Sequence, residues 1–308
     1  MSKTDWNNLL SHYKGSIYNM ADVVKFAQSQ GVDVPTALDL VAAEFPLVEK
    51  GEMLPVPKFF ASFEPNLKFD AGVWEQMSIA ASLPVFYGGA LMPDAHSGYA
   101  LPVGGVAVLE NALSPAFIGY DIGCRVTYSP LGISEQNVEA AKAAIKHIAR
   151  FGFDTNEGQN AQWHPVLENP LWDEIPFLRG LKDKARLQLG TSGSGNHFID
   201  LMKAGNGYGI LTHSGSRGVG HKVGTYYMDL AEKLCPVNTP KGYGYLPFDS
   251  AEGQEYWAVM GLMGEYARAC HHLIHARVNL ALRIKGIDTK VWGDVLPGSQ
   301  WKNISTVL

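Results

Sequence analysis

Apolar residues recur at intervals of three and four positions in several parts of the chain, which is the spacing of a helix with one buried face. This pattern predicts helices within residues 1–50, 70–83, 134–150, 219–234 and 255–284. Ser134, the first residue of the third segment, is of a type that favours the capping position just before a helix. The segment 255–284 carries the longest helical pattern in the chain.

Short apolar runs bounded by glycine-rich turns alternate with the helical segments, and such runs are typical of buried β-strands. The runs predict strands at Val103–Leu109, Phe117–Tyr120, Arg186–Leu189, His197–Met202 and Tyr208–Thr212. Loops or connectors are predicted at 51–66, 151–175 and 236–254. The pattern contains no internal repeat and no domain boundary.

Apolar residues make up 46% of the 308 positions and charged residues 18%, which is a globular composition and excludes a disordered chain. The formal net charge of −5 is unusual for a general nucleic-acid-binding protein, so a polyanionic partner would need a local basic patch. Three scattered cysteines are too few for a disulfide framework. The sequence shows neither a transmembrane run nor a signal peptide, so we expect a soluble cytoplasmic protein with no membrane partner.

Asp121 and Cys124 lie three residues apart around Gly123, in the segment GYDIGCRV. A tight turn can point both side chains at one ion. A carboxylate suits a hard ion such as Mn²⁺, and a thiolate can bridge two divalent metals. The alternative is a buried free cysteine beside a turn-forming aspartate, which the spacing alone favours.

The segment LGTSGSGNHF places His197 after three glycines. Glycine permits positive φ and a close approach of the backbone to a phosphate, and Asn196 can offer an amide to a phosphate oxygen. A glycine-rich hairpin turn with an incidental histidine explains the same residues equally well.

The segment LTHSGSRGVGH places His213 at the end of a predicted strand and ahead of a predicted helix. Ser214, Ser216 and Arg217 follow it. Hydroxyls, a guanidinium and a helix N-terminus together are typical of a phosphate site. The structural alternative is a well-capped turn between a strand and a helix, but the arginine favours a functional role.

Two further pairs of residues have a spacing that bears on metal binding. Asp94 and His96 are separated by one residue, so an extended backbone would place them on the same side. They would then support metal ligands by hydrogen bonding, or form an ordinary aspartate turn with an exposed histidine. His271 and His275 are four apart, which suits zinc, but their alanine- and leucine-rich surroundings favour a role in packing.

In their order along the chain, four segments resemble the RtcB family of RNA-splicing ligases over roughly residues 90–285. GYDIGCR is similar to the family's Asp–Ile–Gly–Cys segment, and LGTSGSGNHF is similar to its glycine-rich Asn–His segment. LTHSGSRG resembles the His–Ser–Gly–Ser–Arg segment, and MPDAHSGYALPVGG resembles the Pro–Asp–x–His segment. The resemblance implies an α+β fold with mixed β-sheets surrounded by helices.

The resemblance also implies an activity, namely ligation of an RNA 3′-phosphate or 2′,3′-cyclic phosphate to a 5′-hydroxyl, with GTP and Mn²⁺ as cofactors. In such enzymes a histidine takes GMP from GTP, and the GMP then activates the RNA 3′-phosphate. Carried over by residue, the ligands of two Mn²⁺ ions would be Asp121, Cys124, His197 and His213, with Cys124 as the bridge. Residues near nucleotide or phosphate would be Asn196, Ser214, Ser216 and Arg217, and residues supporting the ligands would be Asp94 and His96.

Two later segments of the family are not found in this sequence. One carries a further metal-binding histidine, and the other carries the nucleotide-accepting histidine in a Gly–Ala–Gly–Arg context. We therefore expect residues 1–308 to form a single RtcB-like catalytic domain that is truncated at its C-terminus and is not guanylated alone. The alternatives are a dimetal phosphoesterase, and an inactive metal- or nucleotide-binding protein that pairs with a second chain supplying the missing part.

Overall fold

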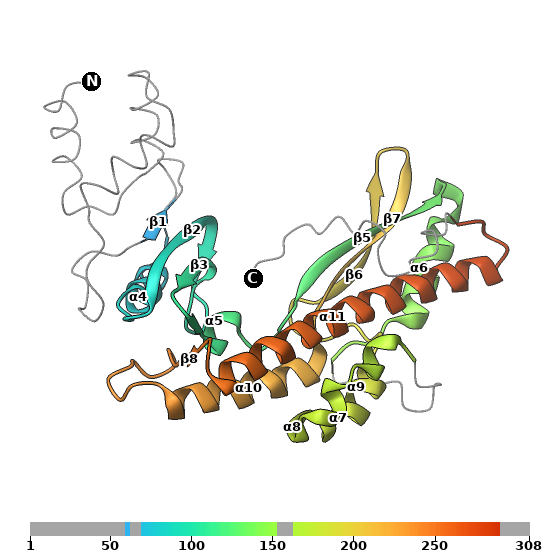
Figure 1. Ribbon diagram of the computed structural model, residues 1–308. Helices are drawn as coiled ribbons and strands as arrows, with labels where there is room; N and C mark the ends of the chain where they lie inside the picture. Colours follow the sequence, from blue (N-terminus) through green and yellow to red (C-terminus); the bar gives the residue numbers. More distant parts are fainter. Residues whose placement is uncertain (1–58, 62–68, 153–162, 290–308) are drawn as a thin grey trace, which may run out of the picture. The chain divides into compact units, whose positions relative to one another are not determined.

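The computed structural model describes residues 59–61, 69–152 and 163–289 (Figure 1). The helices predicted within residues 1–50 lie outside the described residues. In chain order the elements are β1 (Phe59–Ala61), α4 (Ala71–Ala81), β2 (Phe86–His96), β3 (Val103–Leu109), β4 (Ala112–Leu113), α5 (Pro115–Ile118), β5 (Arg125–Ile133), η1 (Glu135–Asn137), α6 (Val138–Ile148), η2 (Pro165–Glu168), α7 (Leu171–Glu174), α8 (Pro176–Arg179), α9 (Lys182–Gln188), β6 (Phe198–Ala204), β7 (Gly207–Ser214), α10 (Arg217–Leu234), β8 (Leu246–Pro247) and α11 (Ala251–Ile284).

The chain divides into two compact units, and each unit combines two segments of the sequence. The first unit takes residues 1–117 and 230–253, and the second takes residues 118–229 and 254–308. A single catalytic domain over the whole chain stays a prediction.

A three-stranded sheet with the order β1–β2–β3 organises the first unit. β1 is parallel to β2, whereas β3 is antiparallel to β2, so the sheet is mixed. Helix α4 begins after Asp70, whose carboxylate accepts a hydrogen bond from the Val73 amide at 3.0 Å and so satisfies a free donor of the first turn. The core of this unit buries Val73, Met77, Phe86, Leu91 and Tyr243.

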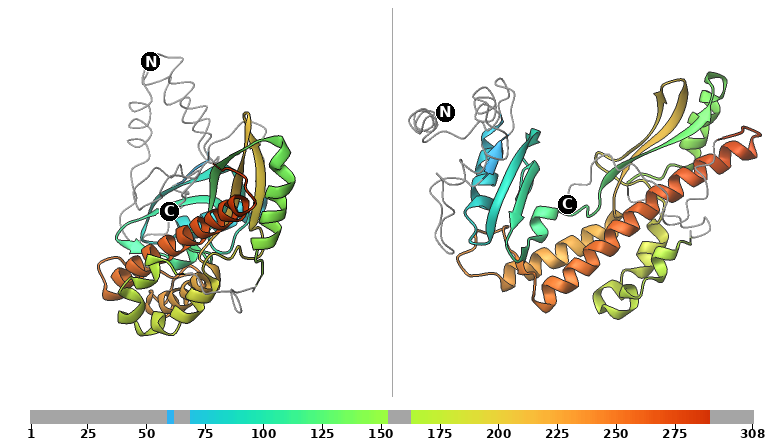
Figure 2. Two further views of the ribbon diagram at one scale, coloured as in Figure 1. Left: turned by 90° about the vertical axis from the view of Figure 1, so that its right-hand side faces the viewer. Right: turned by 45° about the horizontal axis from the view of Figure 1, so that its top comes forward.

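An antiparallel sheet with β7 between β5 and β6 organises the second unit. α6 and α11 pack against this sheet, and Figure 2 shows α11 running alongside it. The core that they share buries Leu131, Ile133, Ala144, Ile199, Ile210, Ile274 and Val278. Because α11 extends over 34 residues, it reaches well past the part that packs against the sheet.

A buried polar network joins α11 to this sheet. The Thr212 hydroxyl lies 2.6 Å from His271 Nδ1 and 2.8 Å from His275 Nε2. The Ser129 hydroxyl hydrogen-bonds to His275 Nδ1, and His271 Nε2 donates to the Ser214 carbonyl at 3.0 Å. Burial lowers the pKa of His271 to about 4 and that of His275 to about 3. Both rings are therefore neutral near pH 7, and the packing role favoured by their sequence surroundings is confirmed.

Most of the predicted elements are confirmed. Helices α4, α6, α10 and α11 and strands β3, β6 and β7 all occupy predicted segments, and the α+β class with mixed sheets is correct. The long loop predicted at 151–175 instead contains the short helices η2 and α7. In residues 69–152 and 163–289, no helix combines the length and the apolar character that crossing a membrane requires.

Two of the predicted strands are wrong. Phe117–Tyr120 is the end of the short helix α5 followed by a turn, in which Gly119 adopts a φ of +84°. Arg186–Leu189 belongs mainly to α9. The residues of α9 include Lys, Ala, Arg, Leu and Gln, which all favour helices, so local propensity outweighed the short apolar run there.

Candidate metal centre

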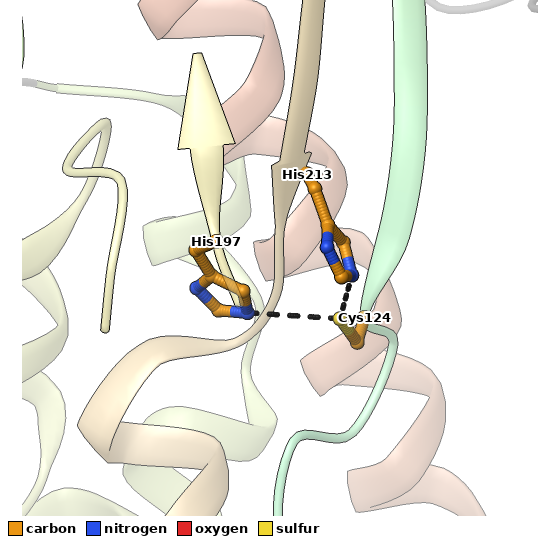
Figure 3. Close-up of side chains that lie close together, drawn as sticks. All are labelled: Cys124, His197 and His213. Carbon is orange, nitrogen blue, oxygen red and sulfur yellow. Dashed lines mark hydrogen bonds between the residues drawn. The ribbon is translucent and has the colours of Figure 1, made fainter. Parts of the chain in front are cut away.

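Three side chains of metal-ligand type meet at one end of the β5–β7–β6 sheet (Figure 3). Cys124 directly precedes β5, His197 directly precedes β6, and His213 lies on the central strand β7. The strand register explains the meeting, because His213 pairs with Val126 on one side and with Phe198 on the other. Segments that are far apart in the sequence therefore reach the same edge.

The ligand atoms of Cys124, His197 and His213 form a compact group, which we call the ligand triad. Cys124 Sγ lies 3.0 Å from His213 Nε2 and 3.6 Å from His197 Nε2. All three ligand atoms lie within 4.8 Å of one another. Thiolate and imidazole are ligands of Zn²⁺ and other divalent transition metals, so this donor set fits a metal ion.

Backbone carbonyls orient both imidazole rings of the triad. His197 Nδ1 donates to the Ser192 carbonyl at 3.0 Å, and His213 Nδ1 donates to the Asn196 carbonyl at 3.1 Å. Because a carbonyl can only accept, each Nδ1 carries a hydrogen, and each Nε2 faces Cys124. Histidines that bind metals usually have such a partner on the other ring nitrogen.

Asp121 lies beside the triad. Its Oδ2 is 2.7 Å from His197 Nε2, and its Oδ1 accepts a hydrogen bond from the Ser216 amide at 3.1 Å. Burial opposes ionisation of this carboxyl, but the hydrogen bond and the charge of His197 outweigh burial and hold its pKa below the ordinary value. The structure therefore brings the four predicted ligands together.

The Cys124 thiol keeps its proton when no cation is bound. Although Cys124 is an exposed residue, the atoms packed around its sulfur and the negative charge of Asp121 raise its pKa well above the ordinary value. A divalent cation binds the thiolate, so binding would displace this proton. Metal affinity is therefore expected to fall as the pH decreases.

The absence of a side chain at Gly215 leaves the room that the Asp121 carboxylate occupies. A Cβ at this position would lie 2.1 Å from Asp121 Oδ1, which no real contact allows. We expect Gly215→Ala to displace the carboxylate and to weaken Mn²⁺ binding by about tenfold or more. Calorimetric titration with Mn²⁺ measures this change. The control is Gly261→Ala, which adds a methyl group to an open, exposed position on α11. Equal Mn²⁺ affinity in the two variants would contradict the prediction.

The side chains that were predicted to lie near phosphate differ in exposure. Asn196 is exposed, whereas Ser214 is buried and its hydroxyl donates to the Ser192 carbonyl at 2.6 Å. Ser216 is also buried, and among the described residues its hydroxyl has no hydrogen-bond partner. Arg217 is 7% exposed and opens α10 with a φ of +60°. Their roles toward a phosphate stay predictions.

Asp94 and His96 lie on β2, in the first unit. Both are exposed, and His96 Nδ1 lies 3.0 Å from the Asp94 carbonyl oxygen. Their predicted support of the metal ligands stays a prediction.

A pocket of about 530 Å³ includes Asp121 and His197 in its wall. Three cationic side chains also line it, namely Lys184, Arg217 and Lys222. Among the described residues, neither lysine has an ion-pair partner, and Asp121 is the one acidic residue of the wall. The pocket is therefore a local basic patch in a chain of negative net charge, which is what a polyanionic partner would require.

The pocket wall also contains residues that were not predicted as site residues, namely Lys184, Lys222 and the stacked rings of Tyr120 and His221, whose centroids are 4.8 Å apart. A signal was available for His221, because it lies four residues after Arg217 and therefore on the same face of α10. Lys184 comes from α9, and no spacing rule connects it to the other residues.

The protein thus has an α+β fold in which a cysteine–histidine group that could hold a metal ion lies at the end of an antiparallel sheet, beside a cationic pocket. Comparison with known families is more specific. The family model described as tRNA-splicing ligase RtcB matches residues 76–166 and 176–290. The chain therefore belongs to the RtcB family, and the resemblance seen in its four segments is confirmed.

Curated relatives carry the same family name. The tRNA-splicing ligase RtcB of Archaeoglobus fulgidus is 32% identical over an alignment of 251 positions, which covers 63% of this chain and 52% of the relative. The RNA-splicing ligase RtcB of Escherichia coli is 31% identical over 183 positions, which cover 53% of this chain and 45% of the relative. The tRNA-splicing ligase RtcB of Pyrobaculum aerophilum is 25% identical over 285 positions, which cover 75% of this chain and 58% of the relative. The chain spans about half the length of the curated relatives that it matches.

Proposed function

We propose that this protein acts in RtcB-type RNA ligation. It binds Mn²⁺ and an RNA end that bears a 3′-phosphate or a 2′,3′-cyclic phosphate, for joining to a 5′-hydroxyl end with GTP as cofactor. The observation that carries the proposal is the ligand triad of Cys124, His197 and His213 next to the cationic pocket. Asp121 as a fourth ligand, and Cys124 as a bridge between two ions, belong to the same proposal. Membership of the RtcB family supports this choice of substrate and cofactors.

The residues of this chain would bind and orient the phosphate end. Lys184, Lys222 and Arg217 would attract it and hold it from the pocket wall by charge. Asn196, which is exposed at the same pocket, would offer an amide hydrogen. A divalent cation bound at the triad would supply the positive charge that neutralises phosphate oxygens and favours in-line attack at phosphorus.

We expect the double variant Lys184→Ala/Lys222→Ala to bind a 3′-phosphorylated RNA oligonucleotide about tenfold more weakly, because two cations leave the pocket wall. The slope of log affinity against log salt concentration should decrease by about 1 for each lysine removed. Fluorescence anisotropy over a series of salt concentrations measures both effects. The matched control is Lys182→Ala, which lies on the same helix but pairs with Asp173 at 2.6 Å. An equal loss in the control would contradict the role of the pocket.

The reaction itself is tested with RNA ending in a 2′,3′-cyclic phosphate, RNA with a 5′-hydroxyl, GTP and Mn²⁺. A joined product that requires GTP supports the ligase proposal. Opening of the cyclic phosphate without joining and without GTP would overturn it in favour of a phosphoesterase. A product that forms only after a chain with a nucleotide-accepting histidine is added would show that the protein works in a pair.

A further inference from the structure

Strand β7 presents different faces to α11 and to the metal centre. Successive residues of a strand point to opposite faces. Accordingly, the Thr212 side chain contacts His271 and His275 on α11, whereas the next residue, His213, points to Cys124. Helix α11 therefore packs on the face of β7 opposite to the one on which His213, a proposed metal ligand, points to Cys124.

His271 joins the two residues that flank His213. Its Nε2 donates to the Ser214 carbonyl at 3.0 Å, so this nitrogen carries the ring hydrogen. Its Nδ1 lies 2.6 Å from the Thr212 hydroxyl and accepts the hydrogen of that group. One neutral, fully buried ring therefore fixes the chain on both sides of the ligand.

Ser214 extends this connection to the other histidine of the triad. Its hydroxyl donates to the Ser192 carbonyl at 2.6 Å, and the same carbonyl accepts the hydrogen of His197 Nδ1 at 3.0 Å. Ser214 is 0% exposed, so water cannot replace these contacts. A continuous series of hydrogen bonds therefore runs from α11 to the ring of His197.

We propose that His271 is a positioning residue for the metal centre. Through Ser214 it sets the place of His213, which is the adjacent residue, and the ring orientation of His197, which shares a carbonyl with Ser214. The inference rests on the proposed metal site but goes beyond its ligands, and it gives Ser214 a supporting role inside the protein. Such partners matter because ligand rings that shift or rotate slightly lose metal affinity.

The test compares three variants by titration with Co²⁺, followed through the thiolate-to-metal absorption. His271→Leu removes both hydrogen bonds, and His271→Gln keeps a donor that can reach the Ser214 carbonyl. The matched control is His275→Leu, one turn further on the same helix and also buried, since His275 bonds to Thr212 and Ser129 but not to Ser214. We expect His271→Leu to lose affinity about tenfold to a hundredfold, with a changed spectrum. His271→Gln should recover most of the affinity, and His275→Leu should keep it despite a comparable loss of stability.

A second measurement uses the protein without metal. Long-range ¹H–¹⁵N NMR spectra of the imidazoles report the hydrogen on His197 Nδ1, and His271→Leu and Ser214→Ala should change these signals while His275→Leu should not. Wild-type Co²⁺ affinity in His271→Leu, or unchanged His197 signals, overturns the inference. If the wild-type protein binds no Co²⁺, the proposed metal site fails, and the NMR comparison still decides the positioning role. If His271→Leu does not fold, Ser214→Ala carries both measurements.

Discussion

Replacement of Cys124 by alanine is expected to lower the affinity for Mn²⁺ by more than about a hundredfold, beyond the loss that follows mutation of a supporting residue. The sulfur takes part in both short contacts of the triad, at 3.0 Å to His213 and 3.6 Å to His197. Its removal would leave Asp121 as the single anionic group beside two imidazoles. The charge of the cation would then be less neutralised, and one coordination position would be lost.

Electron paramagnetic resonance of free Mn²⁺ near neutral pH, with thiols kept reduced, measures this loss. Cys235→Ala is the matched control, since that thiol hydrogen-bonds to the Glu232 carbonyl and belongs to the first unit, outside the ligand triad. The control should bind Mn²⁺ as the wild type does. If Cys124→Ala binds Mn²⁺ with the affinity of the wild type, the proposed metal site at the ligand triad is wrong.

Acidification to about pH 5 is expected to destabilise the fold by about 4 kcal/mol through His271 and His275, about 2 kcal/mol each. Burial lowers their pKa values to about 4 and about 3, whereas a histidine in the unfolded chain titrates at about 6.5. As the pH falls below about 6.5, the unfolded state takes up protons that the folded state cannot yet bind. The contribution is therefore fully present above this pH and is lost progressively down to about pH 4 for His271 and about pH 3 for His275.

Urea unfolding at a series of pH values from neutral to about pH 5 measures this dependence. In His275→Gln about half of the pH dependence should disappear, because one of the two buried rings is gone. His147→Gln, which changes an exposed ring on α6, is the control and should keep the wild-type slope. A free energy of unfolding that does not change over this range would contradict the prediction.

Local sequence signals predicted the turns and the strand end at which the proposed ligands lie, whereas their assignment as ligands came from the resemblance to the RtcB family. Asp121 and Cys124 flank Gly123, which adopts a φ of +73°, and the Cys124 amide donates to the Asp121 carbonyl across this turn. His213 stands at the end of a strand, in front of the helix that the apolar spacing predicted. A turn of this kind and a strand end depend on nearby residues, so composition and spacing were sufficient for them.

Features that depend on distant pairing could not be predicted in the same way. The register that sets His213 opposite Val126 and Phe198 arises from packing of whole strands, which no local pattern specifies. Lys184 on α9 and Arg217 on α10 line one pocket through the packing of helices that are distant in the sequence, which no local pattern specifies either. No local signal marks the positions where the chain passes between the two units, because α5, α10 and α11 each continue across one of these positions.

The interleaving of their segments limits how either unit could be exchanged between genes. Residues 118–308 contain every residue of the second unit, with 230–253 as an internal insertion. The ligand triad, Asp121 and His271 would thus be inherited together in any recombination that kept this stretch. Residues 1–253 likewise contain every residue of the first unit, with 118–229 as an internal insertion, so exchanging either unit alone between genes would require the transfer of two separate stretches.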